Sequence, residues 1–188
     1  RNAERTASQI AMHDQKTGLP NRALFRDHLG LMLAQAKRTQ KPLAVLSLDL
    51  DHFKSINDLH GHEVGDMALV SVAHAVVHAV AERGSVFRFG GEEFVVVLEG
   101  ISAARTAAIA EEIRVAATNV GEGVGDTLSA GRRISNSREV PTGVTVSVGV
   151  ASTDTPSATS LDELFDLADA RMFAAKRAGR NRVVADSD

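Results

Sequence analysis

The stretch VFRFGGEEFVVVL, Val86 to Leu98, constrains the fold of this chain more than any other segment. Two strand-like apolar runs flank the pair Gly90-Gly91, and a two-residue glycine connection is typical of a tight β-hairpin turn with positive φ. A hairpin within the sheet makes the two strands antiparallel. The segment therefore favours an α+β layer structure over a doubly wound parallel sheet.

Apolar residues recur at helical spacing in four further segments, and strand-like runs separate them. The expected helices are Asn21 to Thr39, His62 to Arg83, Ala103 to Val120 and Ser160 to Ala178. The expected strands outside the hairpin are Leu43 to Asp51, Gly143 to Ser152 and Asn181 to Ala185. The segment Gly121 to Gly143 is rich in Gly, Ser and charge, which predicts a loop or a mobile hairpin.

Length and composition exclude several classes of protein. A chain of 188 residues is long enough for one well-buried domain, which we expect over residues 12–188, after a helical linker over residues 1–11. The net charge of -3 without a basic stripe argues against nucleic acid as a partner. The lack of Cys, of a signal peptide and of a membrane-length apolar run predicts a cytoplasmic domain. Because the chain begins with Arg1, we expect it to be part of a longer protein, which could be anchored to a membrane.

Carboxylates gather where two expected strands meet a turn. Asp49 and Asp51 are alternate residues at the end of an apolar run, and Glu92 and Glu93 follow the glycines. Taken singly, each pair also fits an ordinary turn, a solvated carboxylate or a helix cap. Together they offer hard oxygen ligands, and Mg²⁺ takes one or two protein carboxylates plus substrate phosphates. The pattern favours a nucleotide site over a zinc site, because the histidines form no H-E-x-x-H helix.

Five motifs in order, from about His13 to Val183, resemble the GGDEF family, the diguanylate cyclases. They read HDQKTGLPNRALF, LDLDHFKSINDLHGHEVGD, RFGGEEF, VTVSVGVAS and ADARMFAAKRAGRNRV, with the signature in its acidic GGEEF form. The resemblance implies a nucleotidyl-cyclase-like, ferredoxin-like α+β fold, in which helices cover a mostly antiparallel central sheet. Lys16 stands where the family usually has an apolar residue, and we expect this departure to affect only local packing.

The resemblance also implies an activity: two GTP molecules are condensed into cyclic di-GMP and two pyrophosphates across a homodimer, in bacterial second-messenger signalling. An upstream sensor or receiver domain is implied in the full-length chain. Two other functions stay open. One is a non-catalytic GGDEF module that binds GTP or cyclic di-GMP and regulates a neighbouring domain, and the other is a mononucleotide cyclase of similar fold.

The family's catalytic positions fall on the carboxylates noted above. By resemblance, Asp49, Glu92 and the carbonyl of Leu50 hold two Mg²⁺ or Mn²⁺ ions per active site. Glu93 is implied either to assist deprotonation of the attacking 3′-hydroxyl or to orient a ligand. Gly90 and Gly91 match substrate-binding positions.

Basic residues of two motifs are implied to face the triphosphate, because phosphoryl transfer depends mostly on positioning and electrostatics. Lys176 and Arg180 match phosphate-binding positions, although basic residues at a helix C-terminus also suit the helix dipole without any ligand. Lys54, a catalytic candidate, and the backbone amides of Phe53 and Lys54 resemble the family's phosphate-contacting turn. The alternative for Lys54 is a solvated lysine at the start of a helix.

Asn57 and Asp66 match the positions that hold the guanine base, and capping of a helix start is their alternative. A carboxylate accepts hydrogen bonds from guanine N1–H and the exocyclic amine, whereas adenine presents a bare acceptor at N1. A site built to satisfy such bonds rejects the analogue that lacks them. This chemistry favours GTP over ATP.

Many family members carry an inhibitory product site, Arg-x-x-Asp, a few residues before the glycines. The corresponding stretch here reads Ala81-Glu82-Arg83-Gly84. Arg83 is out of register and no Asp follows it at the required spacing, so we expect no inhibitory product site in the usual position.

Overall fold

The computed structural model describes residues 12–131, 144–154 and 160–185, so the linker expected over residues 1–11 lies outside the described residues. The helices are α2 (Arg22–Thr39), α3 (Phe53–His60), α4 (His62–Val80), the short 3₁₀ helix η1 (Ala81–Arg83), α5 (Ala103–Gly131) and α6 (Leu161–Arg177). The strands are β1 (Leu43–Leu50), β2 (Gly84–Arg88), β3 (Glu93–Glu99), β4 (Val146–Ser152) and β5 (Val183–Val184).

The strands form one five-stranded sheet in the order β2-β3-β1-β4-β5. Strand β1 lies at its centre and pairs antiparallel with both β3 and β4, while β2 pairs antiparallel with β3. Only the short β5 runs parallel to its neighbour β4 among the described strands. The α+β fold with a mostly antiparallel sheet, predicted from the sequence, is confirmed.

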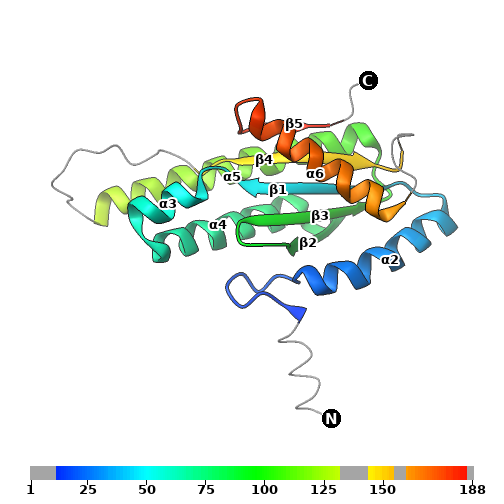
Figure 1. Cartoon of the computed structure of the whole chain (residues 1–188), viewed down its shortest axis with the longest axis horizontal. Helices are drawn as coiled ribbons and strands as arrows, with labels where there is room; N and C mark the ends of the chain where they lie inside the picture. Colours follow the sequence, from blue (N-terminus) through cyan, green and yellow to red (C-terminus); the bar gives the residue numbers. More distant parts are fainter. Residues whose placement is uncertain (1–11, 132–143, 155–159, 186–188) are drawn as a thin grey trace, which may run out of the picture.

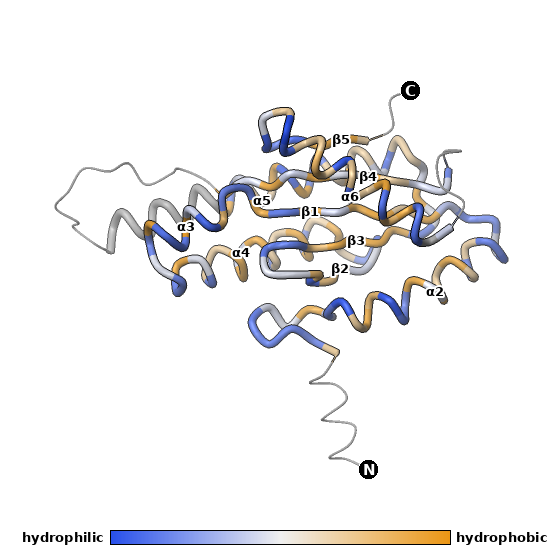
Figure 2. Tube along the Cα trace, viewed as in Figure 1, coloured by the Kyte–Doolittle hydropathy of each residue, from blue (hydrophilic) through white to orange (hydrophobic). Residues whose placement is uncertain are grey.

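Helices cover both faces of this sheet (Figure 1). On one face of the sheet, Leu46 and Leu48 of β1 pack against α4 and α5. On the other face, Leu43 and Val45 of β1 pack against α2 and α6. Every residue of β1 is buried. A strand covered on both faces has no solvent-facing side, which explains why β1 is mostly apolar, with Ser47 and Asp49 as its polar residues (Figure 2).

Helix α4 and η1 together, His62–Arg83, are long and apolar enough to cross a membrane by length and composition alone. The expectation that the chain has no membrane-length apolar run is therefore wrong for this segment. Leu69, Val72 and Val76 of this segment are fully buried in the core under the sheet. Packing against the sheet therefore accounts for its apolar character.

The structure corrects two further expectations. Residues Phe53–His60 form α3, which the apolar periodicity does not predict, because only Phe53 of this helix is buried. Helix α5 continues to Gly131, so the loop expected over residues 121–143 is wrong for its first half. Glycine lowers helix propensity but does not forbid helical backbone angles. The rest of the expected loop, residues 132–143, lies outside the described residues.

Candidate active site

The acidic residues predicted for the site meet where the central strand β1 ends beside β3. Asp49 faces Glu93 across the antiparallel ladder, and the backbone N–H of Leu50 donates to the carbonyl of Glu92 at 3.2 Å. Helix α6 adds a cation here, because the Nζ of Lys176 lies 2.7 Å from Asp49 Oδ2. The structure thus brings Asp49, Glu92, Glu93 and Lys176 together from three elements.

The three carboxylates of this site, Asp49, Glu92 and Glu93, lie close enough to repel one another. Burial raises the pKa of Asp49, and Lys176 opposes that shift without cancelling it. Burial also raises the pKa of Glu92 and of Glu93, and the charge of Asp49 raises both further. Desolvation and like-charge repulsion both disfavour the ionised carboxylates, and a bound cation would relieve both.

The donor atoms fit a hard divalent cation. Among the described residues, no group of three Asp, Glu or His side chains is placed to hold a metal ion. The predicted ligand set needs only the carboxylates of Asp49 and Glu92 with the carbonyl of Leu50. Two carboxylates with substrate phosphates are a typical Mg²⁺ environment, so the residues present suit that ion.

The glycine turn is built differently from the prediction. Strand β2 ends at Arg88 and β3 begins at Glu93, so the connection has four residues, and neither glycine is among those with positive φ. At Gly90 the carboxylate of Glu93 occupies the space of a side chain, because a Cβ there would lie 2.5 Å from Glu93 Oε2. No atom lies within 4 Å of a Cβ at Gly91, which leaves its backbone open to a ligand.

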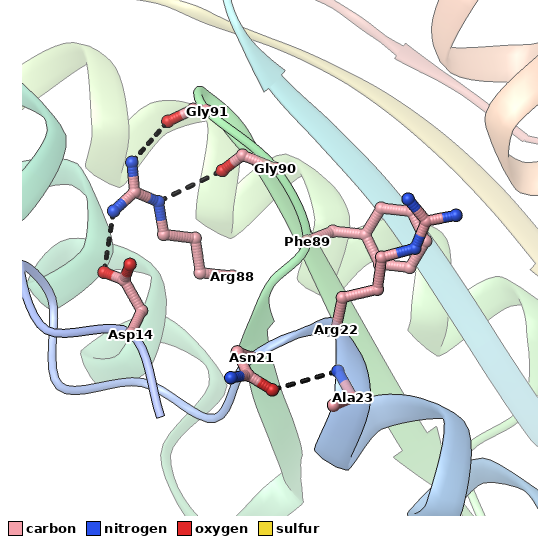
Figure 3. Close-up of a pocket in the computed structure, with 8 residues that line it drawn as sticks. All are labelled: Asp14, Asn21, Arg22, Ala23, Arg88, Phe89, Gly90 and Gly91. Atoms are coloured by element: carbon pink, nitrogen blue, oxygen red, sulfur yellow. Dashed lines mark hydrogen bonds and ion pairs between the residues drawn. The ribbon is translucent and has the colours of Figure 1, made fainter. Parts of the chain in front are cut away.

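Arg88 holds this turn from one side (Figure 3). Its guanidinium donates to the carbonyls of Gly90 at 3.1 Å and Gly91 at 2.7 Å, and to Asp14 Oδ1 at 2.7 Å. A pocket of about 430 Å³ opens beside it, where Arg22 lies 4.6 Å above the ring of Phe89. Asp14 and Arg88 belong to motifs noted in the sequence, but spacing alone does not indicate that they meet.

The start of α3 presents backbone amides at the end of β1. His52 adopts a left-handed conformation with φ 57°, and no side chain caps the helix that begins at Phe53. The first amides of a helix lack intrahelical acceptors, and together with the helix dipole they favour an anion. Lys54 is exposed in this first turn, where no acidic residue lies.

Arg180 lies in a strained loop after α6, where its charge weakly opposes the rise that burial causes in the pKa of Asp49. Arg180 and Asn181 have φ values of 63° and 45°, in the left-handed region that residues other than glycine rarely adopt. Asn181 is fixed from two sides: its N–H donates to Asp51 Oδ2 at 3.0 Å, and its Oδ1 accepts from Arg114 Nη1 at 2.6 Å.

Asp51 does not serve as the free oxygen ligand that the sequence suggests. It is 3% exposed, and its carboxylate also accepts hydrogen bonds from the hydroxyls of Thr145 at 2.8 Å and Ser147 at 2.7 Å. With Asn181 as a third donor, the carboxylate is engaged by protein groups on both oxygens. Its place is structural support for the loop that carries Arg180.

The predicted base-binding residues lie on neighbouring helices, Asn57 on α3 and Asp66 on α4. A Cβ at Gly65 would lie 1.8 Å from Asn57 Oδ1, so the missing side chain lets Asn57 pack against Gly65, the residue before Asp66. Lys16 donates to both oxygens of Asp66, at 2.5 and 2.7 Å. Lys16 therefore forms an ion pair with Asp66, in addition to the local packing expected of it.

The guanidinium of Arg83, the arginine next to the usual position of the inhibitory product site, is bound by groups of the domain itself. Its Nε donates to the carbonyl of Val80 at 3.2 Å, and its Nη2 contacts the carbonyl of Ala79 and, at 2.9 Å, Glu112 Oε2. These contacts tie the end of α4 to α5.

This fold and this arrangement of carboxylates and basic residues match one protein class. The family model described as diguanylate cyclase, GGDEF domain, matches residues 11–182. The chain belongs to the GGDEF family, and the resemblance predicted from the sequence is confirmed.

Similar proteins extend over nearly the whole chain. A probable diguanylate cyclase, DgcT of Escherichia coli, is 36% identical over 97% of this chain and 37% of its own length. The response regulator PleD of Caulobacter vibrioides is 36% identical over 94% of this chain and 36% of its own length. The chain thus spans little more than a third of these curated relatives.

A solved structure gives the same result for the fold. The coiled coil and GGDEF domain of DgcB from Caulobacter crescentus, in complex with c-di-GMP, superposes with a TM-score of 0.82 at 32% identity. The match covers 99% of this chain and 91% of that chain.

Proposed function

We propose that this domain is an active diguanylate cyclase that condenses two GTP molecules into cyclic di-GMP and two pyrophosphates. The observation that carries the proposal is the convergence of Asp49, Glu92 and Lys176, where β1, the β2–β3 turn and α6 meet. A scaffold domain has no need for a buried Asp49 and a half-buried Glu92 with raised pKa values beside a lysine. Perturbed carboxylates of this kind are characteristic of catalytic sites.

The phosphate-binding groups act by position and charge. The amides of Phe53 and Lys54 and the ammonium of Lys54 bind the triphosphate from the start of α3, while Lys176 and Arg180 approach it from the end of α6. Lys176 is paired with Asp49 at 2.7 Å, so it is held at the site. Gly90 and Gly91 let the substrate pass close to the backbone of the turn.

Diguanylate cyclases of this family generally use a divalent metal. Asp49, Glu92 and the carbonyl of Leu50 would hold two Mg²⁺ or Mn²⁺ ions, which activate a hydroxyl nucleophile and neutralise phosphate charge when bound. Glu93, whose pKa is raised by burial and by the charge of Asp49, accepts the 3′-hydroxyl proton or orients a ligand.

Asn57 and Asp66 select guanine at the other end of the nucleotide. Asn57 packs against Gly65, the residue before Asp66, and the two polar side chains complement guanine N1–H and the 2-amino group. Each subunit holds one GTP, and two subunits bring the nucleotides together head to tail, so the working unit is a homodimer. We place this reaction in the cytoplasm, under an upstream sensor or receiver domain like that implied by the response regulator PleD.

Incubation of the domain with GTP and Mg²⁺, followed by identification of the product by mass, tests the proposal. Cyclic di-GMP supports it, and a cyclic mononucleotide would reassign the domain to a mononucleotide cyclase. If GTP or cyclic di-GMP binds but no product forms, even with the domain fused to a dimeric coiled coil, the domain is a non-catalytic binding module.

A further inference from the structure

Lys16 forms an ion pair with the carboxylate assigned to guanine. Its Nζ lies 2.5 Å from Asp66 Oδ1 and 2.7 Å from Asp66 Oδ2, so the ammonium sits between the two oxygens. The two side chains are about half exposed, at 53% and 42%. A ligand can therefore reach this pair from solvent.

The turn that carries Lys16 is well fixed. Asp14 Oδ1 accepts hydrogen bonds from the backbone N–H and the hydroxyl of Thr17, both at 2.8 Å, and from Arg88 at 2.7 Å. The N–H of Gly18 also donates to the carbonyl of Asp14 at 2.8 Å. A rigid base reduces the conformational entropy that Lys16 loses when it pairs with Asp66.

Guanine and the ammonium require the same acceptors. A guanine edge would bridge the Asp66 carboxylate with two donors, N1–H to one oxygen and the 2-amino group to the other. Lys16 already bridges those two oxygens. The base cannot make both bonds until the ammonium moves away, so part of its binding free energy goes into breaking the ion pair.

We propose that Lys16 is a specificity-determining residue that competes with guanine for Asp66 and thereby lowers both GTP affinity and discrimination against ATP. The inference rests on the base pocket of the proposed function. Adenine presents no N1–H donor, so it gains nothing from a vacated Asp66, and removal of Lys16 should favour GTP selectively. Exposed ion pairs of this kind correspond to a factor of up to about five in an equilibrium constant.

Nucleotides that bind but cannot react give the cleanest measurement. 3′-Deoxy-GTP and 3′-deoxy-ATP lack the attacking hydroxyl, so calorimetric titration with Mg²⁺ reports binding alone. In Lys16→Met, which keeps the length of the side chain without its charge, the Kd for 3′-deoxy-GTP should fall about two- to five-fold. The Kd for 3′-deoxy-ATP should not fall, so the preference for guanine rises.

Two controls isolate the pair. Lys37→Met removes one exposed lysine at the end of α2 and should leave both affinities unchanged. The gain from Lys16→Met should also vanish when Asp66 is already Ala, because the two changes act on one interaction.

Equal shifts for the two nucleotides in Lys16→Met would show that the lysine acts only through long-range charge, and would overturn the inference. Weaker 3′-deoxy-GTP binding would overturn it as well, since Lys16 would then assist the base. Asp66→Ala separates this failure from failure of the proposed function. If that variant keeps the full preference for guanine, the base pocket itself is wrongly assigned.

Discussion

The backbone N–H of Asn181 donates to Asp51 Oδ2 at 3.0 Å, which couples the end of the central strand to the loop that carries Arg180. Two consecutive left-handed residues, Arg180 and Asn181, persist only where surrounding contacts outweigh their strain. Asp51 is buried and held by two hydroxyls, so it supplies such a contact. We infer that Asp51 positions Arg180 without contacting substrate.

We expect Asp51→Asn to weaken triphosphate binding. The amide has one acceptor oxygen in place of two, so at least one of the three donors loses its partner, at a cost of about 1–3 kcal/mol in stability. The loop should relax and Arg180 should leave its position. The Kd for GTP should then rise several-fold in calorimetric titration, while the Kd for guanosine, which has no phosphate, stays the same.

Asp27→Asn, on the exposed side of α2, provides the matched control and should change neither stability nor affinity. Equal losses of GTP and guanosine affinity in Asp51→Asn would instead indicate general damage to the domain and would argue against a positioning role.

We expect Glu92→Gln and Asp49→Asn each to lower the rate of cyclic di-GMP formation by at least about 100-fold, while the domain stays folded. Each change removes a metal-binding charge and keeps the shape of the side chain. Product formation is measured with GTP and Mg²⁺, and circular dichroism checks the fold. Near-normal turnover in either folded variant would contradict the metal-site assignment.

The metal-free domain should become less stable as the pH rises above about 4.5, the ordinary pKa of Glu. Burial and the charge of Asp49 raise the pKa of Glu92 and Glu93 in the folded domain. The folded state therefore binds more protons than the unfolded chain between the ordinary and the raised pKa values, and the free energy of unfolding falls through that window.

Thermal unfolding across this pH range, with and without Mg²⁺, measures the effect. Glu92→Gln should flatten the decline and raise the Tm of the metal-free domain at neutral pH by a few degrees. Mg²⁺ should raise the Tm of the parent domain and have little effect on the variant. A steeper decline in Glu92→Gln would contradict the sign of this contribution.

Most of the fold could be predicted because its helices and strands bury regular apolar patterns. Helix α2 and helix α6 lie within a residue of their expected bounds at each end. Helix α3 could not be found this way, because only Phe53 of the helix is buried. The left-handed His52 turns the chain into it, and apolar spacing carries no signal for such a turn.

The sequence placed candidate-site residues correctly where they lie at the ends of regular elements, as with Asp49 after an apolar run and Lys176 in the last turn of α6. Asp49 and Glu92 come together because β1 and the hairpin are neighbours in the sheet. The contact between Asp51 and Asn181 joins residues 130 positions apart, and it depends on the path of a strained loop. The pairing of Lys16 with Asp66 likewise depends on how a turn folds over α4, which no local pattern encodes.

Product inhibition provides the last prediction. The segment Ala81-Glu82-Arg83-Gly84 has neither the Arg nor the Asp of the family's Arg-x-x-Asp motif at the required positions. Arg83 already donates to the carbonyl of Val80 and to Glu112. Cyclic di-GMP carries the same guanine that Asp66 is proposed to hold. We therefore expect cyclic di-GMP to inhibit competitively against GTP, and Arg83→Ala to change its inhibition constant less than two-fold.

Steady-state inhibition at several GTP concentrations distinguishes the two sites. Competitive inhibition raises the apparent KM and leaves kcat unchanged, because enough GTP displaces the product from the shared pocket. A bidentate arginine and carboxylate grip elsewhere would lower kcat at saturating GTP. Tight, non-competitive inhibition that disappears in Arg83→Ala would show that Arg83 leaves Glu112 to bind product, and that a separate inhibitory site exists.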